Sequence, residues 1–168
     1  MAILYEMSIP ILTRALTNLK FFLKKGEDWA KDNNVPVQKL LDGKLAEDMK
    51  TLPFQIQTCS NTAKFIAVRT AGVENEEWED NETTFEQLYE RIDKTVAFLN
   101  KVKPESFEGK ENAEVVMKAG PNEYKFTGLS YLQKFALPNF FFHEVMAYGI
   151  LRNAGVPVGK LDYLGKEL

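Results

Sequence analysis

Histidine and cysteine are the side chains best suited to act as bases, nucleophiles or metal ligands near neutral pH, and this sequence contains one of each, His143 and Cys59. One histidine and one cysteine cannot make a Cys/His-rich zinc site, so any metal would need carboxylates. A single cysteine cannot form an internal disulfide, which is typical of a reducing compartment. We therefore expect a cytoplasmic protein and predict neither a cofactor nor a bound divalent metal.

Two predicted helices carry polar residues that could lie near His143 in the folded protein. One reading is a ligand pocket, in which His143 acts as a base or hydrogen-bonds a ligand. The other is a packed histidine satisfied by a neighbouring side chain, with Asn139 capping a helix. Both readings stay open. The candidate ligand-binding residues come from two helices: His143, Asn139, Gln55, Thr58 and Asn61.

Glu144 and Cys59 could also take part in chemistry, but the sequence favours other roles for them. Glu144 follows His143 directly, and adjacent helical residues do not converge on one ligand, so Glu144 is expected to be a surface or interface charge. Cys59 lies on an apolar stripe, which favours an inert packing thiol. Neither residue completes a recognisable catalytic site, so the sequence leaves open whether the protein is an enzyme.

Two N-terminal segments place apolar residues at alternating spacings of three and four, the period of an amphipathic helix. The first begins at Ser8, a plausible N-cap, and is expected to end at Gly26. The second begins at Thr51 and ends at Gly72. Each has one apolar stripe, as helices of a bundle do.

Two C-terminal segments repeat this pattern. One starts at Thr83, in capping-box spacing with Glu86, and must end before Pro104. The other covers residues 128–153, and Pro138 inside it predicts a kink or two abutting helices. Its apolar stripe is expected to include the histidine and to face the bundle interior: Leu132, Ala136, Phe140, His143, Ala147, Ile150 and Ala154.

The connections complete the expected architecture. The polar stretch after Gly26 is read as a loop that crosses an end of the bundle, with a short helix near 37–41, and the six acidic residues of 74–82 as a solvated loop. Residues 113–126 have the pattern of two short strands around a Gly-Pro turn. We predict an all-α protein, an antiparallel four-helix bundle with a long crossover and a small β-hairpin before the last helix, forming a single domain over residues 1–168.

Composition excludes several classes of partner. The chain has 168 residues, 45% of them hydrophobic, which is enough for one apolar core. Its formal net charge is −3 with no basic run, so nucleic acid is not expected as a partner. No stretch reaches the length of a membrane span, and the N-terminus does not resemble a signal peptide.

The run from Leu132 to His143, continued by residues 147–160, resembles the DUF1993 family of unknown function, which is grouped with the DinB/YfiT-like helical bundles. The segments 52–55 and 162–165 also look familiar. The resemblance implies a four-helix bundle, frequently dimeric. It belongs to a superfamily whose better-known members bind a divalent metal through three histidines, some of them being thiol-dependent transferases.

That metal pattern takes one histidine from the second helix and two, four residues apart, from the last helix. Only His143 matches, because position 147 is Ala147 and the second helix contains no histidine. We therefore expect a small-molecule-binding bundle that has lost the metal site. Two alternatives stay open, an enzyme using His143 for proton transfer or a transferase-type reaction, and a structural or partner-binding homodimer. A homodimer is expected, with the phenylalanines near His143 at its interface.

Overall fold

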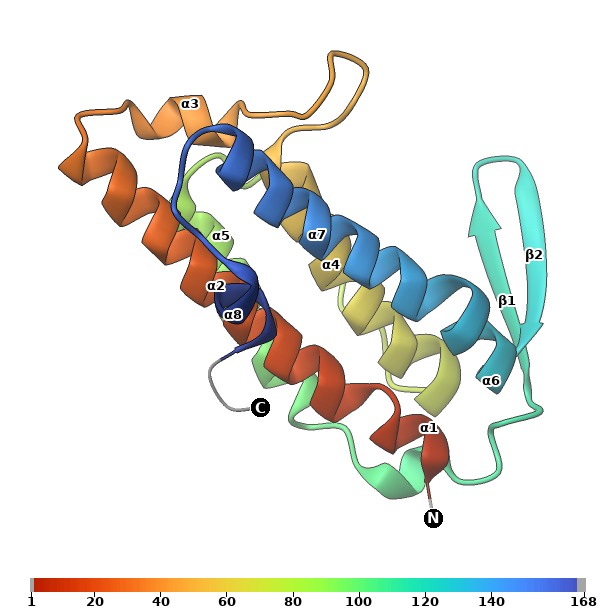
Figure 1. The fold of residues 1–168 in the computed structure, drawn as a ribbon. Coiled ribbons are helices and arrows are strands. Elements are labelled where there is room, and N and C mark those ends of the chain that lie inside the picture. The colour runs from red at the N-terminus through yellow and green to blue at the C-terminus, as the bar shows by residue number, and fades with distance from the viewer. Residues whose placement is uncertain (1, 166–168) are drawn as a thin grey trace.

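Four long helices form the protein, and the computed structural model describes them within residues 2–165 (Figure 1). They are α2 (Ile9–Asp32), α4 (Leu52–Ile66), α5 (Phe85–Leu99) and α7 (Leu137–Asn153). A short helix, α1 (Ile3–Glu6), precedes α2. The predicted fold class, a helical bundle with a small hairpin before the last helix, is confirmed.

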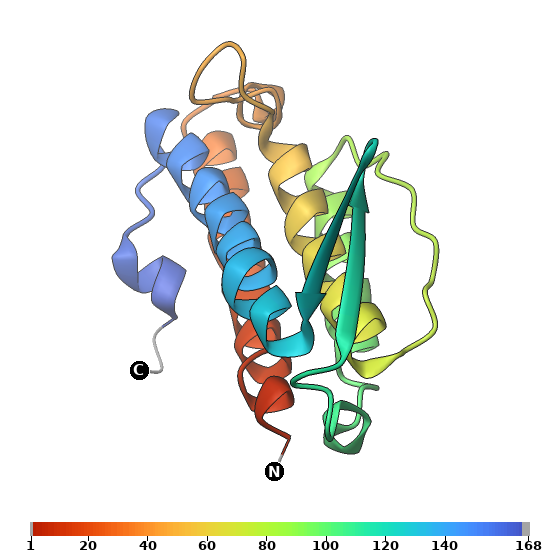
Figure 2. The same cartoon turned by 90° about the vertical axis from the view of Figure 1, so that its right-hand side faces the viewer.

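The direction of the helices follows from the connections between them. Helix α4 packs on α7, and α2 on α5, with antiparallel directions in each pair. Helices α4 and α5 run in the same direction, since the segment 72–84 returns along the length of the bundle (Figure 2). The long crossover therefore lies between α4 and α5, in addition to the connection over residues 33–51 at one end of the bundle.

The first helix is longer than its sequence pattern predicted. Helix α2 continues to Asp32, so the expected end at Gly26 is wrong. Gly26 is buried, and a Cβ there would lie 3.0 Å from Leu151 Cδ2. This glycine is explained by close helix packing against α7. The predicted short helix in the following connection is present as α3 (Val37–Leu41).

The ends of the two middle helices follow from their capping residues. Helix α4 continues into a π-helical turn, η1 (Ala67–Ala71), and ends at Gly72, whose φ of 72° is left-handed. Helix α5 begins with a capping box made by Thr84 and Gln87, one residue later than predicted. Its end lies before the short 3₁₀ helix η2 (Pro104–Phe107).

The predicted hairpin is confirmed as β1 (Glu114–Ala119) paired antiparallel with β2 (Asn122–Thr127). It leads into α6 (Gly128–Tyr131), the π-helical turn η3 (Leu132–Ala136) and then α7. Pro138 is the second residue of α7, and because η3 runs into α7 with helical backbone at Ala136 and Leu137, its missing N–H lies next to the wider π-helical turn. The expected interruption is thus a change of helix type just before the proline.

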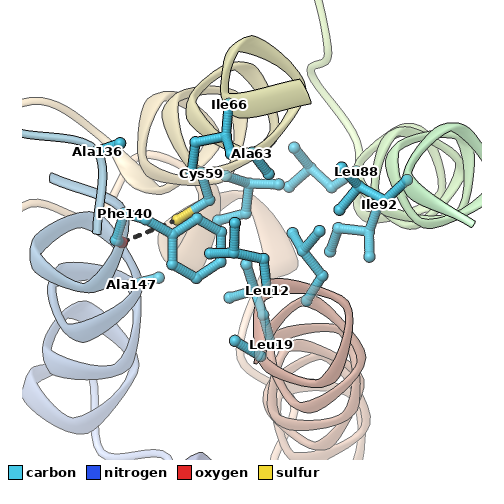
Figure 3. Packing of buried hydrophobic residues seen from close by; sticks show 14 of the residues in the cluster. Leu12, Leu19, Cys59, Ala63, Ile66, Leu88, Ile92, Ala136, Phe140 and Ala147 are labelled. Atoms are coloured by element: carbon cyan, nitrogen blue, oxygen red, sulfur yellow. Dashed lines mark hydrogen bonds between the residues drawn. The ribbon is translucent and has the colours of Figure 1, made fainter. Parts of the chain in front are cut away.

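The core lies between the four long helices. Figure 3 shows Cys59 of α4 beside Phe140 and Ala147 of α7, with Leu12 and Leu19 of α2 opposite them, and all five are fully buried. Burying a large apolar side chain contributes about 1.5–3 kcal/mol. Cysteine and alanine on the α4 and α7 faces allow these two helices to pack closely.

The acidic crossover is an irregular segment in which most residues are exposed, as expected, and it is held against the bundle at Arg91. Arg91 on α5 is 4% exposed and contacts the carboxylates of Asp80 at 2.8 Å and Glu82 at 2.7 Å. Its Nε donates to Ser60 on α4 at 2.7 Å. Its guanidinium lies 5.3 Å from the Trp78 ring. One buried cation therefore offsets part of the like-charge repulsion in this exposed loop.

The described chain ends in the helix α8 (Lys160–Leu164), which packs on α2. Lys25 on α2 pairs with Asp162 at 2.8 Å, and Asn18 donates to the backbone carbonyl of Tyr163 at 3.2 Å. None of the residues of α8 is buried. Between residues 2 and 165, no helix has the length and apolar character needed to cross a membrane.

Candidate functional site

The histidine is paired with a glutamine across the contact between α4 and α7. Nδ1 of His143 lies 2.7 Å from Oε1 of Gln55. The Gln55 amide nitrogen donates to the carbonyl of Lys50 at 3.0 Å, which turns the amide oxygen toward the imidazole. An amide oxygen only accepts, so Nδ1 carries the hydrogen and Nε2 is left as the basic nitrogen.

His143 lies at the edge of the bundle and not in its interior. Its side chain is half-buried, and its ring makes edge contacts with Phe54 at 5.9 Å and Phe142 at 5.1 Å, both of which are exposed. Burial lowers the pKa of His143, which favours the neutral ring. The expectation that it shares the inward stripe of α7 is therefore wrong.

The other predicted ligand-binding residues separate into two groups. Asn139 donates to Thr62 at 2.9 Å, so it lies on the same α4–α7 contact as the His143 pair. Thr58 lies on α4 and donates to its own helix, at the carbonyl of Phe54. Asn61 points elsewhere, because its amide contacts Asp80 of the crossover and Arg91 of α5. The structure thus does not bring Asn61 to the histidine.

Glu144 is the α7 side chain that faces the interior. It is 1% exposed, which corrects the expectation of a surface or interface charge. Successive helical residues point about 100° apart, so when His143 lies at the edge its neighbour turns inward. The buried residues of α7 are Phe140, Glu144, Ala147, Ile150 and Leu151.

The environment of Glu144 favours its neutral form. Burial raises its pKa to about 8, although a hydrogen bond from the Tyr163 hydroxyl of α8 acts in the opposite direction. Burial and the neighbouring Glu144 carboxyl raise the pKa of Tyr163. Among the described residues, Oε1 of Glu144 has no hydrogen-bond partner. A buried polar atom without a partner costs about 1–3 kcal/mol, so a group that hydrogen-bonds to this oxygen would stabilise the protein.

The cysteine is the third polar group of this interior region. Cys59 is fully buried and its thiol donates to the carbonyl of Phe140 at 3.5 Å. Burial raises its pKa well above the ordinary value, and the Glu144 carboxyl adds to the effect. A thiol held neutral is a poor nucleophile and a poor metal ligand. Its position agrees with the prediction of a packing residue.

The divalent metal implied by the superfamily pattern does not fit these residues. Burial raises the pKa of both Glu144 and Cys59, which disfavours the deprotonated forms that metal ligands need. Within the part of the chain that the structure describes, no group of three His, Cys, Asp or Glu side chains could hold a metal ion.

Two residues of the site were missed from the sequence, Glu144 and Tyr163. A signal for Glu144 existed, because Phe140, Ala147 and Leu151 form an inward stripe into which position 144 fits as well as position 143. Helix α7 is apolar on several faces, so this choice of phase was ambiguous. Nothing in the short terminal segment marked Tyr163 as a partner of α7.

The chain was compared with known protein families and solved structures. Residues 4–164 match the family described as a domain of unknown function, DUF1993. A DinB family member protein from Shewanella denitrificans has a similar crystal structure, with 32% sequence identity and a TM-score of 0.91 over 97% of this chain and 92% of that chain. No curated protein sequence matches significantly. The resemblance read from the sequence is confirmed, and the chain belongs to the DUF1993 family, with a DinB-like fold.

Proposed function

We propose that this protein is a small-molecule-binding helical bundle that has lost the three-histidine metal site of its superfamily. The observation that carries the proposal is the Glu144 carboxyl, which is buried between the helices with Oε1 unpartnered among the described residues. Ligand sites in bundles are commonly lined by apolar side chains with a few convergent polar groups. Glu144 and Tyr163 supply such groups, and Cys59, Phe140 and Ala147 supply the apolar surroundings.

The His143 contact is a separate part of the proposal. Its Nε2 is the acceptor nitrogen of a neutral ring, and Gln55 fixes the ring orientation. The seam made by Gln55, Thr58, Thr62 and Asn139 therefore offers a second polar surface for the same or another ligand. Because His143 and Glu144 point in different directions, one small molecule is not expected to touch both.

A thermal-shift screen tests the main proposal. Purified wild-type protein and the Glu144→Gln variant are screened against metabolites, thiols and divalent metals. A ligand at about 100 times its Kd should raise the wild-type Tm by about 5–10 °C and the variant Tm by much less. A ligand that shifts both proteins equally would place binding elsewhere. About one equivalent of zinc, nickel or iron in the purified protein would contradict the lost metal site.

A second candidate function is proton-transfer catalysis, which the raised pKa of Glu144 favours. A carboxylic acid with a pKa of about 8 can act as a general acid or base near neutral pH, and Glu144 has this property. The sequence pattern suggested His143 for this role, but its imidazole lies outside the interior region. A reaction screen whose activity is lost in Glu144→Gln and retained in His143→Gln would support the revised form.

We also propose a cytoplasmic homodimer. The buried, free Cys59 is compatible with a reducing compartment. Exposed apolar side chains of α4 and α7 support self-association, with Phe142 53% exposed, Val145 43% exposed and Phe54 39% exposed. Phe54 and Phe142 contact the His143 ring, so a dimer formed there would cover the histidine.

A further inference from the structure

The side chain of Lys64 is buried between α4 and the acidic crossover without an ion pair. It is 2% exposed, and its Nζ donates to the backbone carbonyl of Glu76 at 2.6 Å. Among the residues that the structure describes, no carboxylate lies within ion-pair distance of this nitrogen. Lysines are rarely buried unless they are paired, so this amine points to a role beyond packing.

Two aromatic rings and two further cations surround the amine. Nζ of Lys64 lies 4.7 Å from the centre of the Phe65 ring and 4.8 Å from that of Trp78. The Trp78 ring also has Cζ of Arg91 at 5.3 Å and Nζ of Lys94 at 4.6 Å. Burial lowers the pKa of Lys64, as do Arg91 and, more weakly, Lys94, against the opposing effect of two crossover carboxylates. A lysine that is desolvated and close to other cations is more readily available as a neutral nucleophile.

Lys64 also lines a surface hollow between α4 and the crossover. The hollow has a volume of about 590 Å³, which is within the range of small-molecule sites. Phe65 and Trp78 belong to its lining as well, so the two rings beside the amine are also walls of the hollow. Three acidic side chains complete the lining near the amine: Glu77, Glu79 and Asp80.

The segment that covers the amine can open at low cost. Residues 72–83 have no regular secondary structure, and Glu76, whose carbonyl accepts from Lys64, is exposed. Segments with few buried apolar contacts open locally more easily than the core. A small molecule in the hollow can therefore reach the nitrogen without unfolding the bundle.

We propose that Lys64 is a covalent binding site for a small uncharged aldehyde or ketone, which lies between Phe65 and Trp78 while its carbonyl carbon bonds to Nζ. This inference goes beyond the proposed function, because neither Glu144 nor His143 lines the hollow.

The reaction is the reversible formation of an imine. The ammonium of Lys64 first loses a proton to water, and the nitrogen lone pair then forms a bond to the carbonyl carbon while the oxygen becomes a hydroxyl. Uptake of one proton and loss of water break the C–O bond and leave a protonated imine. Overall, an ammonium ion and an aldehyde become an iminium ion and water. The charge is unchanged, and no oxidant or reductant is needed.

The surroundings of the amine suit this product. An iminium nitrogen keeps one N–H, which can take over the hydrogen bond to the Glu76 carbonyl. Its positive charge stays beside the Phe65 and Trp78 rings, whose faces attract cations. A ligand carrying a carboxylate would instead meet the three acidic side chains of the lining, so the ligand is uncharged.

Reductive trapping on the full-length protein tests the site. Benzaldehyde is the uncharged probe and 4-carboxybenzaldehyde the anionic one, and cyanoborohydride reduces each imine to a stable amine. Peptide mass spectrometry then gives the labelling rate of each lysine. Lys94 is the matched control, because its Nζ lies over the same Trp78 ring but its side chain is exposed.

Benzaldehyde should label Lys64 about tenfold faster than Lys94 at pH 7, since each unit by which a pKa falls raises the neutral fraction about tenfold. At pH 10.5, the ordinary pKa of lysine, half of the Lys94 amine is neutral, so the preference should fall to about twofold. Labelling of Lys64 no faster than that of Lys94 at pH 7 would overturn the site.

The anionic probe tests the class of ligand. Relative to Lys94, 4-carboxybenzaldehyde should label Lys64 about threefold more slowly than benzaldehyde does, because of the acidic lining. Equal relative labelling by the two aldehydes would overturn the assignment of an uncharged ligand.

A denatured control and two variants separate this chemistry from unfolding. In concentrated urea the two lysines should react at equal rates, so a preference for Lys64 cannot come from unfolded molecules. Without reductant, benzaldehyde should raise the Tm of wild type and of Lys94→Arg, but not that of Lys64→Arg, which keeps the charge and loses the nucleophilic amine. An equal rise in Lys64→Arg would overturn the covalent site. If Lys64→Arg does not fold, the labelling of wild type still decides the question.

Discussion

His143 and Glu144 are neighbours in the chain but belong to different environments: the imidazole bonds Gln55 at the edge of the α4–α7 contact, and the carboxyl is buried next to Tyr163. Helical geometry causes this separation, since adjacent side chains point about 100° apart. The interior chemistry of the bundle therefore depends on an acid and a phenol, and the histidine serves the surface between two helices.

Replacing Glu144 with glutamine should change how stability depends on pH. The folded-state pKa of about 8 lies above the ordinary 4.5, so the folded protein binds an extra proton between these values. Stability should be highest at low pH within this window and fall as pH rises toward 8, by up to about 1.4 kcal/mol per pH unit. Denaturant unfolding at pH 5 to 9 measures this slope.

The same titration in Glu144→Gln should lack this slope, because glutamine is neutral throughout and similar in shape. Cys59 and Tyr163 are the titratable groups near Glu144 on α4 and α8, and both have pKa values raised above their ordinary range. They stay neutral over the window. Wild type and variant with parallel stability profiles would show that Glu144 is ionised in the folded protein.

A double-mutant cycle on His143 and Gln55 should measure a coupling of about 1 kcal/mol at pH 8, the usual net value of a buried hydrogen bond. The single variants are His143→Phe and Gln55→Leu. Burial lowers the pKa of His143, so its contribution is present above the unfolded-state pKa near 6.5 and is lost as pH falls through the lower folded value. A coupling near zero at pH 8 would contradict the assignment of this hydrogen bond.

Arg91→Met should destabilise the protein by about 3–5 kcal/mol, because it removes the buried cation that Asp80 and Glu82 share. Trp78 of the crossover should lose its packing, so its fluorescence should shift to longer wavelength. Lys20→Met is the matched control, since Lys20 and Asp93 form an exposed pair, expected to contribute about 0–1 kcal/mol. Similar losses in the two variants would mean that Arg91 does not anchor the crossover.

Phe142→Glu should convert the proposed homodimer into a monomer. Phe142 is 53% exposed on α7, so its replacement places a charge in the apolar patch without altering the core. Light scattering of wild type and variant gives the mass directly. Leu161→Glu, at an exposed site on α8, is the control and should leave the dimer intact. A monomeric wild type would end the dimer proposal.

Much of the fold could be predicted from the sequence because local signals agree with it. The period of apolar residues located the four long helices, and Gly120-Pro121 located the hairpin turn. Gly26 misled the prediction for a physical reason: glycine ends helices through its free backbone, but here it is selected by the nearness of Leu151. A sequence does not distinguish these two uses.

The candidate site was harder to predict because it depends on rotation and on distant contacts. The rotation of α7 about its own axis decides whether position 143 or 144 faces inward. Because this helix is apolar on several sides, the sequence does not determine that rotation. Gln55 was named from the sequence only as one of several polar groups near His143, and it pairs with the histidine, whereas Asn61 belongs to the Arg91 network. Glu144 and Tyr163 lie on two helices separated by a turn. The spacing of apolar residues does not predict that they interact.

The parallel course of α4 and α5 has a consequence for biosynthesis. Helix α4 packs most extensively against α7, which is made roughly 80 residues later, so the part of α4 that α7 covers stays exposed until nearly the whole of this sequence has been made. Contacts between such distant segments slow folding and leave apolar surface open to aggregation. We therefore expect chaperones to assist folding during synthesis, and chains truncated before α7 to give poor yields.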